Sequence, residues 1–338
     1  MPIQYDKLIY ALSQQFKTDI ITADFQTTPL RGGTVGNVQL VTGIAVTANG
    51  ERLPYRIVLK VQHQWERYGD PGSWRREYDL YSSDLGSTFS QALRRPTCYH
   101  AEFNAEGNEY RLWLEYIDGV TGLALTDDMY ERAALELGRF QGKLYAEQPS
   151  ALQTLTNLSH ADLMKHTYLH YRSWPLVYDY IRSEGCEFPL HVRRMLIDID
   201  EQADEIFARI EQLPLVLCHR DFWVTNLIYA DGNIALIDWD TSGWGYLGED
   251  LASLIADEPD IDRMVERYRR CVPAYYEGFS EYADVTRIAD HCVYEFILLV
   301  FGYRLVEGYL HAEADDEKTN YVRTLQRIHE MKAIPMGS

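Results

Sequence analysis

Cysteine is scarce in this sequence, and its placement argues against two kinds of structural site. The 338 residues include five cysteines, at positions 98, 186, 218, 271 and 292. No two of them form a Cys-x-x-Cys pair, so neither a zinc site nor a disulfide framework is indicated. Scattered thiols suit a reducing compartment, and we therefore expect a cytoplasmic protein.

Long apolar runs are also missing, which argues against a membrane protein. The N-terminus has no basic region followed by an apolar core, so we expect no signal peptide. The most apolar run near the C-terminus, residues 296–301, is far shorter than the roughly 20 residues that cross a bilayer. We therefore expect no membrane partner. The sequence also has no internal repeats or low-complexity tracts.

Positive charge is in short supply. The chain has 32 Lys and Arg residues against 51 Asp and Glu residues, which gives a net charge of −19. Proteins that bind nucleic acid rely on cationic patches, so we expect no nucleic-acid partner. The acidity is compatible with a cationic ligand, although acidity by itself mainly promotes solubility.

The composition is nevertheless that of a folded protein, with 46% hydrophobic and 25% charged residues. At roughly 150 residues per domain, the length indicates two domains or two lobes around a cleft. Residues 3–16 have the apolar spacing of a helix. A β-rich region comes next, in which residues 38–46 and 55–61 are joined through Asn49-Gly50. That dipeptide favours a hairpin turn, because both residues tolerate a positive φ.

A glycine-rich segment, residues 31–37, precedes the first of these strands. Glycines between strands let backbone amides approach a phosphate, so Gly33 and Gly36 are candidate nucleotide-binding positions. The segment lacks a full Gly-x-Gly-x-x-Gly pattern, and a flexible turn explains it equally well.

Lys60 stands inside the apolar strand 55–61, where a lysine needs either solvent or a partner. Asp70-Pro71 is typical of a helix start, with Asp70 as the N-cap and Pro71 at the first position. Glu77 lies about two turns into that helix and could reach Lys60. Taken alone, each of the two charged residues reads as a surface charge.

The second half of the chain is mainly helical. Residues 110–117 read as a strand, and the composition changes at Asp118-Gly119, where we place a lobe boundary. Apolar residues then recur at helical spacing over most of the remaining chain. The helices expected from this spacing are 130–145, 168–181, 192–213, 247–256, 264–276 and 285–310.

The stretch from Leu215 to Asp240 differs from the helices around it. Residues 215–218 read as a short strand, followed by a turn through residues 219–223. Two further strands, 227–230 and 234–237, are joined by Asp231-Gly232, a hairpin turn signal. This hairpin should bring Asn226 and Asp238 together at its open end, with Asp221 in the loop that leads to the same end.

Oxygen ligands that include one or two carboxylates suit Mg²⁺, which retains waters and shares its ligands with phosphates. A separate carboxylate nearby suits a base that orients a substrate hydroxyl. A catalytic Asp, an Asn and a second Asp on the metals, and a strand Lys paired with a helix Glu are the recurring parts of kinases. The sequence therefore indicates a phosphate-transferring enzyme.

The segment HRDFWVTN, residues 219–226, resembles the HxDxxxxN motif of the eukaryotic-like kinase superfamily. Together with IDWDTSGWGYLGEDLA, residues 237–252, it is most similar to the aminoglycoside phosphotransferase family, which includes antibiotic kinases and relatives of choline kinase. The resemblance implies an α+β, bilobal protein-kinase-like fold. Residues 1–117 would form a small β-rich N-lobe that binds the nucleotide phosphates. Residues 118–338 would form a larger, mainly helical C-lobe with the catalytic loop, the metal site and the acceptor-binding helices.

The resemblance also implies roles for single residues. Asp221 would be the catalytic base, and Asn226 and Asp238 would be the metal ligands. Lys60 would hold the phosphates of ATP or GTP, and Glu77 would orient Lys60. Further roles would fall to the backbone around Glu115 to Ile117, which would bind adenine, and to Asp250, which would hold the catalytic loop. Two departures stand out, at Arg220, where the family often has glycine or asparagine, and at Asp240, a second candidate for the metal.

The acceptor is the least defined part of the prediction. Asp257, Glu258 and Asp260 form an acidic segment that reads either as a solvated loop or as a site for a polycationic substrate. Four aromatic residues at helical spacing either belong to the core or line a cavity for a sugar or a quaternary amine: Tyr168, Tyr171, Trp174 and Tyr178.

The favoured function is a Mg²⁺-dependent kinase that transfers the γ-phosphate of ATP or GTP to a hydroxyl of a small cationic molecule. An aminoglycoside-like antibiotic is favoured as the acceptor. The alternatives are a metabolite kinase that acts on choline, an amino alcohol or a sugar, and a non-catalytic nucleotide-binding protein. A protein kinase fits less well, because Asp238 stands too close to residues 248–252 for an activation loop and a peptide-docking platform. The oligomeric state stays open.

Overall fold

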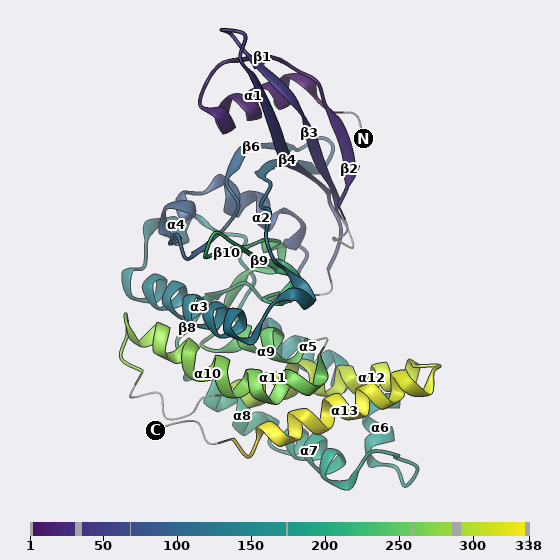
Figure 1. Cartoon of the computed structure of the whole chain (residues 1–338). Coiled ribbons are helices and arrows are strands. Elements are labelled where there is room, and N and C mark those ends of the chain that lie inside the picture. Colours follow the sequence, from purple (N-terminus) through teal and green to yellow (C-terminus); the bar gives the residue numbers. More distant parts are fainter. Residues whose placement is uncertain are drawn as a thin grey trace. The chain divides into compact units, whose positions relative to one another are not determined.

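The computed structural model describes residues 3–30, 36–67, 69–173, 175–257, 260–285 and 292–334 (Figure 1). The chain forms two compact units. Unit 1 comprises Met1–Gly119, Ser150–Asn157 and Ala230–Asp240, and unit 2 comprises Val120–Pro149, Leu158–Tyr229 and Thr241–Ser338. Strands dominate the N-terminal part and helices the remainder, so the α+β fold class expected from the sequence is confirmed. The return of two later segments to unit 1 was not anticipated.

A six-stranded sheet forms the centre of unit 1. Five of its strands lie in the order β1-β3-β4-β7-β6, and β2 pairs with β3 beside them. Their bounds are β1 Ile20–Ala23, β2 Gln26–Pro29, β3 Asn37–Thr47, β4 Arg52–His63, β6 Cys98–Asn104 and β7 Glu109–Glu115. Strands β3 and β4 pair antiparallel with Val41 opposite Ile57, and Gly50 in the connecting turn has a φ of 85°. The hairpin predicted around Asn49-Gly50 is therefore confirmed.

Helices cover both faces of this sheet. Successive side chains of a strand point to opposite faces, so β4 contributes residues to a separate core cluster on each side. On β4, Tyr55, Ile57, Leu59 and Val61 join Leu8 and Leu12 of α1 (Tyr5–Phe16) in one core cluster. Val58 belongs to the opposite face, where Trp74 and Tyr81 of α2 (Ser73–Ser82) pack against Tyr110, Leu112 and Leu114 of β7. Even-numbered residues of β4 therefore face α2.

The predicted cap of α2 is wrong. The helix begins at Ser73, Gly72 occupies the N-cap position, and no side chain caps it. The carboxylate of Asp70 instead pairs with Arg76, one turn inside the helix. A buried arginine requires a counter-charge, and this requirement takes priority over capping.

Unit 1 also contains short elements that come from outside the sheet. These are η1 Asp84–Thr88, β5 Leu93–Arg94, α4 Ser150–Thr154 and β10 Asn233–Leu236. Strand β10 pairs parallel with β5, with Ile234 opposite Leu93. Before β10, Asp231 and Gly232 both have positive φ, as a two-residue hairpin turn requires. Strand β9 (Leu227–Ala230) precedes that turn, so both predicted strands form.

Unit 2 is mainly helical. Its helices include α3 Asp127–Glu147, α5 Leu163–Arg172, α6 Pro175–Arg182, α7 Leu190–Glu201, α8 Ala203–Ile210, α9 Glu249–Ala256, α10 Met264–Ser280, α11 Val293–Ile297, α12 Tyr303–His311 and α13 Asp315–Met331. One two-stranded sheet accompanies them, in which β8 (Leu215–Cys218) pairs antiparallel with β11 (Gly243–Tyr246). Strand β11 and helix α13 were not anticipated from the sequence.

Three helices predicted as single are divided. Residues 168–181 form the end of α5, which stops at Arg172, and α6, which begins at Pro175, a residue favoured at the first position of a helix. Residues 192–213 form α7 and α8, which separate at Gln202. Within 285–310, a π-helical turn at Leu298–Gly302 separates α11 from α12, while residues 286–291 lie outside the described part of the chain.

Helices α3 and α10 approach each other closely, and glycine permits this. A Cβ atom at Gly138 would lie 2.0 Å from the carbonyl oxygen of Tyr275, and one at Gly278 would lie 2.1 Å from that of Leu135. Each helix therefore presents a glycine to the backbone of the other. Neither position has room for a larger residue unless the helices separate.

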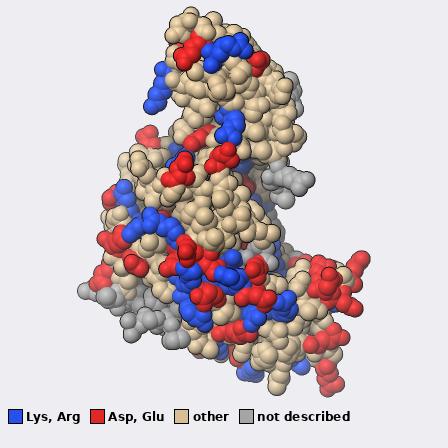
Figure 2. Space-filling view, in the orientation of Figure 1, with Lys and Arg blue, Asp and Glu red and all other residues tan. Residues whose placement is uncertain are grey.

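Charged side chains are unevenly distributed over unit 2. Figure 2 shows acidic and basic residues intermixed over α10, while acidic residues gather at the turn between α12 and α13. That turn carries Glu313, Asp315, Asp316 and Glu317. Within the described part of the chain, no helix combines the length and the apolar character that crossing a membrane requires.

Candidate active site

Lys60 is the first element of the candidate site in unit 1. As an even-numbered residue of β4, it points toward α2, where its Nζ lies 2.5 Å from Oε2 of Glu77. The same Nζ lies 2.6 Å from Oδ1 of Asp238. Burial by itself would lower the pKa of Lys60, but the two carboxylates outweigh burial and raise it well above its usual value. The two carboxylates therefore favour the protonated form of Lys60.

Glu77 is more deeply buried than Lys60, with 1% of its side chain exposed against 12%. Its Oε2 also accepts a hydrogen bond from the hydroxyl of Tyr110, at 3.2 Å. Its Oε1 accepts one from the backbone N–H of Trp239, at 3.4 Å. The contact between Lys60 and Glu77 that the sequence suggested is present, and both residues' roles toward a nucleotide stay predictions.

The segment after β10 brings two carboxylates to the same place. Asp238 has a φ of 65°, a left-handed conformation that non-glycine residues rarely adopt. Asp240 lies two residues later, and its Oδ2 is 3.3 Å from Nη2 of Arg67. Burial and the neighbouring charge of Asp238 raise the pKa of Asp240 to about 7. Asp238, whose side chain is 31% exposed, is thus the more accessible of the two to a cation.

In unit 2, the loop after β8 is held by a carboxylate from α9. Asp250 accepts hydrogen bonds from the backbone N–H groups of His219, at 2.9 Å, and Arg220, at 2.7 Å. Gln141 of α3 donates to Asp250, at 3.0 Å, and to the carbonyl of Leu217. These contacts fix the start of the loop that carries Asp221, as a structural role for Asp250 requires.

Arg220 fixes the same loop through its side chain. It adopts a φ of 64°, in the left-handed region where a glycine would be unstrained. Its Nε lies 3.1 Å from Oε1 of Glu249, and both side chains are nearly buried. Its other nitrogens donate to the hydroxyl of Ser159, at 2.7 Å, and to the carbonyl of Trp244, at 2.5 Å. Sequence reasoning missed Glu249, for which the only available signal was its position beside Asp250.

Asp221 and Asn226 lie together in this loop. The side-chain nitrogen of Asn226 donates to the carbonyl oxygen of Asp221, at 2.9 Å, and to its Oδ2, at 2.8 Å. The amide nitrogen is thereby committed, so the amide oxygen is the atom of Asn226 suited to a metal ion. Asn226 belongs to unit 2 and Asp238 to unit 1, and their pairing across the hairpin stays a prediction.

Each unit offers, taken by itself, an oxygen donor of the kind that binds Mg²⁺ together with phosphates. Among the described residues, no group of three or more His, Cys, Asp and Glu side chains forms a preformed metal cage. Mg²⁺ typically needs only one or two carboxylates when substrate phosphates supply further oxygens. Asp238 in unit 1 and the amide oxygen of Asn226 in unit 2 are each an oxygen donor of this kind, and their joint use for one metal ion stays a prediction.

The residues proposed to hold the nucleotide are only partly described. Gly33 lies outside the described residues, while at Gly36 a Cβ would lie 2.6 Å from Oε1 of Gln62. Strand β7 ends at Glu115, and Ile117 lies beyond it. Arg94 binds both carboxylate oxygens of Glu115, at 2.7 and 2.9 Å. Burial would raise the pKa of Glu115, but these hydrogen bonds outweigh it and lower the pKa.

The residues of the acidic segment proposed for the acceptor differ in burial. Asp257 comes directly after α9, and burial raises its pKa, whereas Asp260 is exposed. Glu258 lies outside the described residues. Asp262, close by, is paired with Arg323 and Arg327 of α13. Its charge is therefore already neutralised.

The aromatic residues at helical spacing in α5 and α6 differ in burial. Tyr168 is 1% exposed and donates to Asp200, at 3.2 Å. Tyr178 lies 3.7 Å below the guanidinium of Arg182. Trp174 lies outside the described residues. At Tyr168 the core interpretation of the stripe therefore holds.

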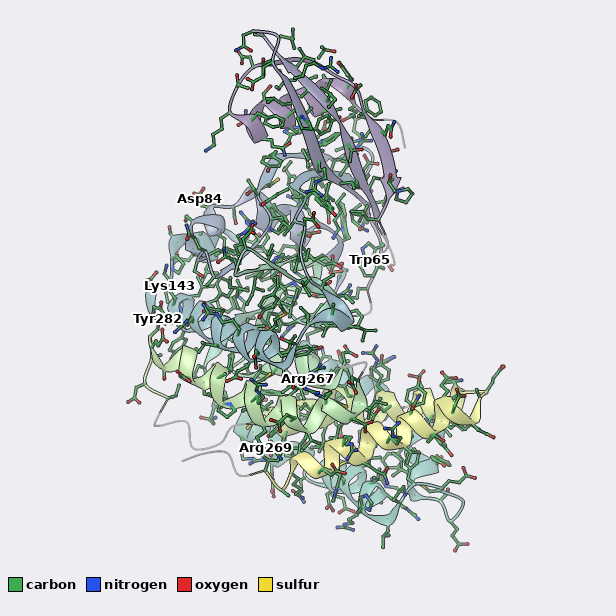
Figure 3. All side chains as sticks on the ribbon, in the orientation of Figure 1. Trp65, Asp84, Lys143, Arg267, Arg269 and Tyr282 are labelled. Atoms are coloured by element: carbon green, nitrogen blue, oxygen red, sulfur yellow. The ribbon has the colours of Figure 1, made fainter. Side chains whose placement is uncertain are left out.

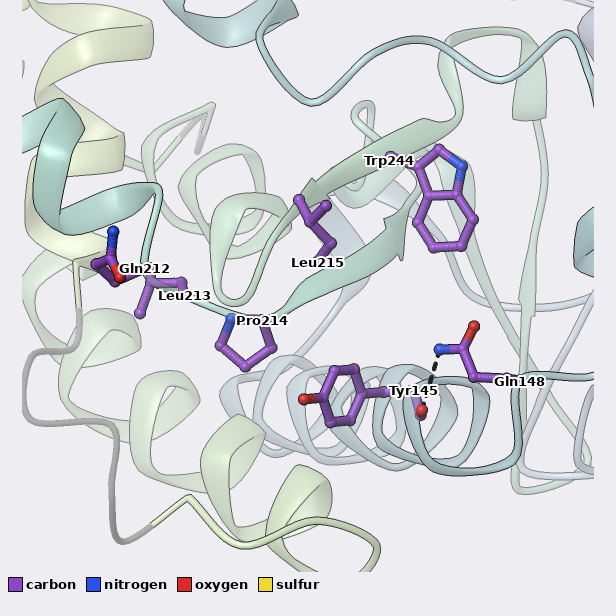
Figure 4. Close-up of a pocket in the computed structure, with 7 residues that line it drawn as sticks. All are labelled: Tyr145, Gln148, Gln212, Leu213, Pro214, Leu215 and Trp244. Atoms are coloured by element: carbon purple, nitrogen blue, oxygen red, sulfur yellow. Dashed lines mark hydrogen bonds between the residues drawn. The ribbon is translucent and has the colours of Figure 1, made fainter.

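An open pocket of about 630 Å³ lies elsewhere in unit 2 (Figure 4). Tyr145, Gln148, Pro214, Leu215 and Trp244 line it together with Gln212 and Leu213. Gln148 donates to the carbonyl of Tyr145, at 3.0 Å. None of the predicted site residues contributes to this lining, so the pocket carries no part of the site.

Two arginines on α10 illustrate how differently charges are held in unit 2 (Figure 3). Arg267 is 6% exposed, and its guanidinium lies 3.7 Å from the ring of Tyr130. Arg269 is exposed and pairs locally, with Glu266 one turn away. Of these two arginines, the buried one thus joins two helices, while the exposed one pairs within its own helix.

Two ethanolamine kinases are similar to this chain in sequence over part of its length. The mouse (Mus musculus) ethanolamine kinase 1 is 33% identical over 86 residues, which cover 22% of this chain and 24% of that protein. The human (Homo sapiens) ethanolamine kinase 1 is 32% identical over 78 residues, covering 20% of this chain and 17% of that protein. The chain thus matches about a quarter or less of the length of these curated relatives.

Solved structures match over nearly the whole chain at low identity. The choline kinase from Cryptosporidium parvum Iowa II has a TM-score of 0.53 at 16% identity, with 97% of this chain and 96% of that chain covered. The GDP complex of aminoglycoside 2′-phosphotransferase-IIIa has a TM-score of 0.54 at 14% identity, with 98% and 100% covered. The microcompartment-associated aminopropanol kinase has a TM-score of 0.51 at 16% identity, with 94% of each chain covered. At such identities the likeness shows the fold alone.

The family model described as the phosphotransferase enzyme family matches residues 87–283, more than half of the chain and the whole stretch with the HRDFWVTN and GEDLA motifs. The resemblance inferred from those motifs is therefore confirmed, and the chain belongs to the phosphotransferase enzyme family.

Proposed function

We propose that this protein is a Mg²⁺-dependent kinase that transfers the γ-phosphate of ATP or GTP to the hydroxyl of a small molecule. The observation that carries the proposal is the contact of Lys60 with both Glu77 and Asp238 in unit 1. Burying a lysine and two carboxylates together has a desolvation cost, and such clusters of buried ionisable groups occur preferentially at functional sites. Membership of the phosphotransferase family supports the same chemistry.

Each residue has a defined task in this proposal. Lys60 stays protonated and supplies positive charge to the nucleotide phosphates. Asp221 accepts a hydrogen bond from the acceptor hydroxyl and orients it toward the γ-phosphorus. A new oxygen–phosphorus bond forms while the bond to the β-phosphate oxygen breaks, and Asp221 receives the hydroxyl proton. Asn226 and Asp238 would hold Mg²⁺, which, when bound, neutralises charge on the phosphates.

The interactions of Asp221 suit an orienting base. Its Oδ2 accepts from Asn226, at 2.8 Å, and this contact fixes the carboxylate without neutralising it. The backbone of the preceding loop is held by Asp250. Asp221 is therefore positioned before any substrate binds, which lowers the cost of reaching a reactive geometry.

A small amino alcohol is the acceptor we propose. The sequence analysis favoured an aminoglycoside-like antibiotic, but the curated relatives are ethanolamine kinases, so the metabolite alternative is better supported. Two of the structural neighbours are named for choline and aminopropanol as well. The likeness to aminoglycoside 2′-phosphotransferase-IIIa keeps that class as the second candidate.

An acceptor panel tests the proposal. Purified protein with Mg²⁺ and ATP or GTP is offered ethanolamine, choline, an amino propanol and an aminoglycoside, and nucleoside diphosphate release is measured. We expect turnover with an amino alcohol and none in the matched Asp221→Ala variant. Asp238→Ala should lose the Mg²⁺-dependent part of its nucleotide affinity. Turnover with the aminoglycoside alone would favour the second candidate, and absence of transfer to every acceptor would refute the proposal.

A further inference from the structure

Arg76, the residue before Glu77 in α2, is the least exposed charged side chain after Glu77 itself among the described residues of unit 1. It is 2% exposed, and its hydrogen-bond partners Asp70, Asn157 and Asp240 all belong to unit 1. Burying a guanidinium is unfavourable unless its donors are satisfied and its charge is compensated. The contacts of Arg76 therefore have to satisfy its N–H donors and compensate its charge.

Four hydrogen bonds satisfy Arg76. Nη1 and Nη2 bind the two carboxylate oxygens of Asp70, at 2.8 and 2.5 Å. Nη1 also donates to the carbonyl oxygen of Asp240, at 2.8 Å, and Nε donates to that of Asn157, at 2.7 Å. The planar guanidinium thus connects three chain segments that are far apart in the sequence. A lysine has one nitrogen and cannot reproduce this fork.

The contact of Arg76 with Asp240 lies close in the sequence to Asp238, the proposed metal ligand. Asp240 lies two residues after Asp238, whose φ of 65° persists in a non-glycine residue only where the surroundings fix it. Glu77 accepts from the N–H of Trp239, and Arg76 donates to the carbonyl of Asp240. Two consecutive residues of α2 therefore hold two consecutive backbone positions on the C-terminal side of Asp238.

Asn157 makes the arrangement more rigid. Its side-chain nitrogen donates to the carbonyl of Gly72, at 2.9 Å, and to Asp79, at 3.2 Å. Its own carbonyl accepts from Arg76. The start of α2, residue 157 and the segment after Asp238 thus share one hydrogen-bonded network, with Arg76 at its centre.

We propose that Arg76 is a positioning residue that fixes Asp238 in the conformation needed to bind Mg²⁺. This inference rests on the proposed kinase function and assigns a role to a residue that the sequence motifs do not include. Arg76 acts through the backbone of Asp240 and does not contact the metal. Loss of its fork frees the segment after Asp238, so metal binding weakens while nucleotide binding without metal is unchanged.

The neighbouring Arg75 supplies a matched control. Its side chain is 45% exposed, pairs with Asp79 on the same helix and lies over the ring of Phe103. Among the described residues, its contacts do not include the segment 238–240. Arg75→Lys therefore repeats the chemical change of Arg76→Lys in the same helix and leaves the four hydrogen bonds of Arg76 in place.

The test measures Mg²⁺ dependence in the full-length chain. Binding of AMP-PNP is measured by calorimetry at increasing Mg²⁺, and again in EDTA, for the wild type, Arg76→Lys and Arg75→Lys. We expect Arg76→Lys to raise the half-saturating Mg²⁺ concentration about tenfold, the factor that corresponds to about 1.4 kcal/mol. Its affinity for AMP-PNP in EDTA should stay within about twofold of the wild type, and Arg75→Lys should match the wild type in both measurements.

Several outcomes would overturn the proposal. An unchanged Mg²⁺ requirement in folded Arg76→Lys protein contradicts it, as does an equal loss of AMP-PNP affinity with and without Mg²⁺, which would indicate a merely structural role. If Arg76→Lys does not fold, Asp70→Asn is judged by the same criteria.

A wild type that neither binds AMP-PNP nor transfers phosphate refutes the proposed function instead. Hydrogen exchange then decides on Arg76: the amides of residues 239–241 should exchange at least about tenfold faster in the variant, and unchanged exchange contradicts the contact's role.

Discussion

Breaking the ion pair between Arg220 and Glu249 should destabilise unit 2, by an amount that depends on which partner is removed. The charged atoms lie 3.1 Å apart, and the side chains are only 7% and 8% exposed. Glu249→Gln leaves the guanidinium buried without its carboxylate. Removal of one partner of a buried pair typically costs about 3–5 kcal/mol, and we expect a loss in that range.

Arg220→Gly should cost less, because glycine removes a backbone strain as well as a charge. The φ of 64° at Arg220 lies in the left-handed region, which costs a non-glycine residue about 1–2 kcal/mol. The remaining Glu249 also keeps one donor, the backbone N–H of Tyr246, at 3.1 Å. We therefore expect Arg220→Gly to be about 1–2 kcal/mol less destabilising than Glu249→Gln.

Urea unfolding monitored by tryptophan fluorescence measures both losses, together with the double variant. The double variant should be more stable than the sum of the single losses predicts, since each single change leaves an unpaired charge that the other removes. The exposed pair Arg269–Glu266 on α10 serves as the control and should contribute less than about 1 kcal/mol. Equal losses for the two single variants, or strict additivity in the double variant, would refute the reasoning.

Two further predictions concern unit 2. Gly138→Ala should destabilise the protein by about 1–3 kcal/mol in urea unfolding, because the new Cβ would lie 2.0 Å from the carbonyl oxygen of Tyr275. As a control, Glu147→Ala at the exposed end of α3 should change the stability by less than about 0.5 kcal/mol. Equal effects of the two substitutions would contradict the close helix crossing. Burial raises the pKa of Asp250 to about 7, against roughly 4 in an unfolded chain, so the folded state holds an extra proton between these values and stability should fall as pH rises from about 4 to 7. A carboxyl-carbon NMR titration of Asp250 with its midpoint near 4 would contradict this.

The local parts of the fold were predictable because their signals lie in short segments. Alternation of apolar residues and the Asn49-Gly50 turn define β3 and β4, and the same alternation turns Lys60 toward α2. The central stretch was predictable for a related reason, since its polar residues interrupt apolar runs at the ends of β8 and β10. Pro175 also carried a usable signal, which the prediction of a continuous helix at residues 168–181 overlooked.

The parts that were not predictable depend on partners far apart in the sequence. Asp70 reads as a helix cap in isolation, and only the burial of Arg76 explains why it pairs instead. The contact between Arg76 and Asp240 joins residues 164 positions apart, and no local pattern announces it. The ion pair of Glu249 with Arg220 is a further example, because it forms where β8 pairs with β11, a strand distant in the sequence.

The central claim is that Asp221 orients the acceptor hydroxyl for phosphate transfer. The most direct measurement compares wild type and Asp221→Asn, a variant that keeps the shape of the side chain and an oxygen for the contact with Asn226. ADP release with Mg²⁺, ATP and ethanolamine should fall by about 10²–10⁴-fold, the usual contribution of a general base, while calorimetry shows unchanged AMP-PNP affinity. Wild-type turnover in Asp221→Asn would contradict the account.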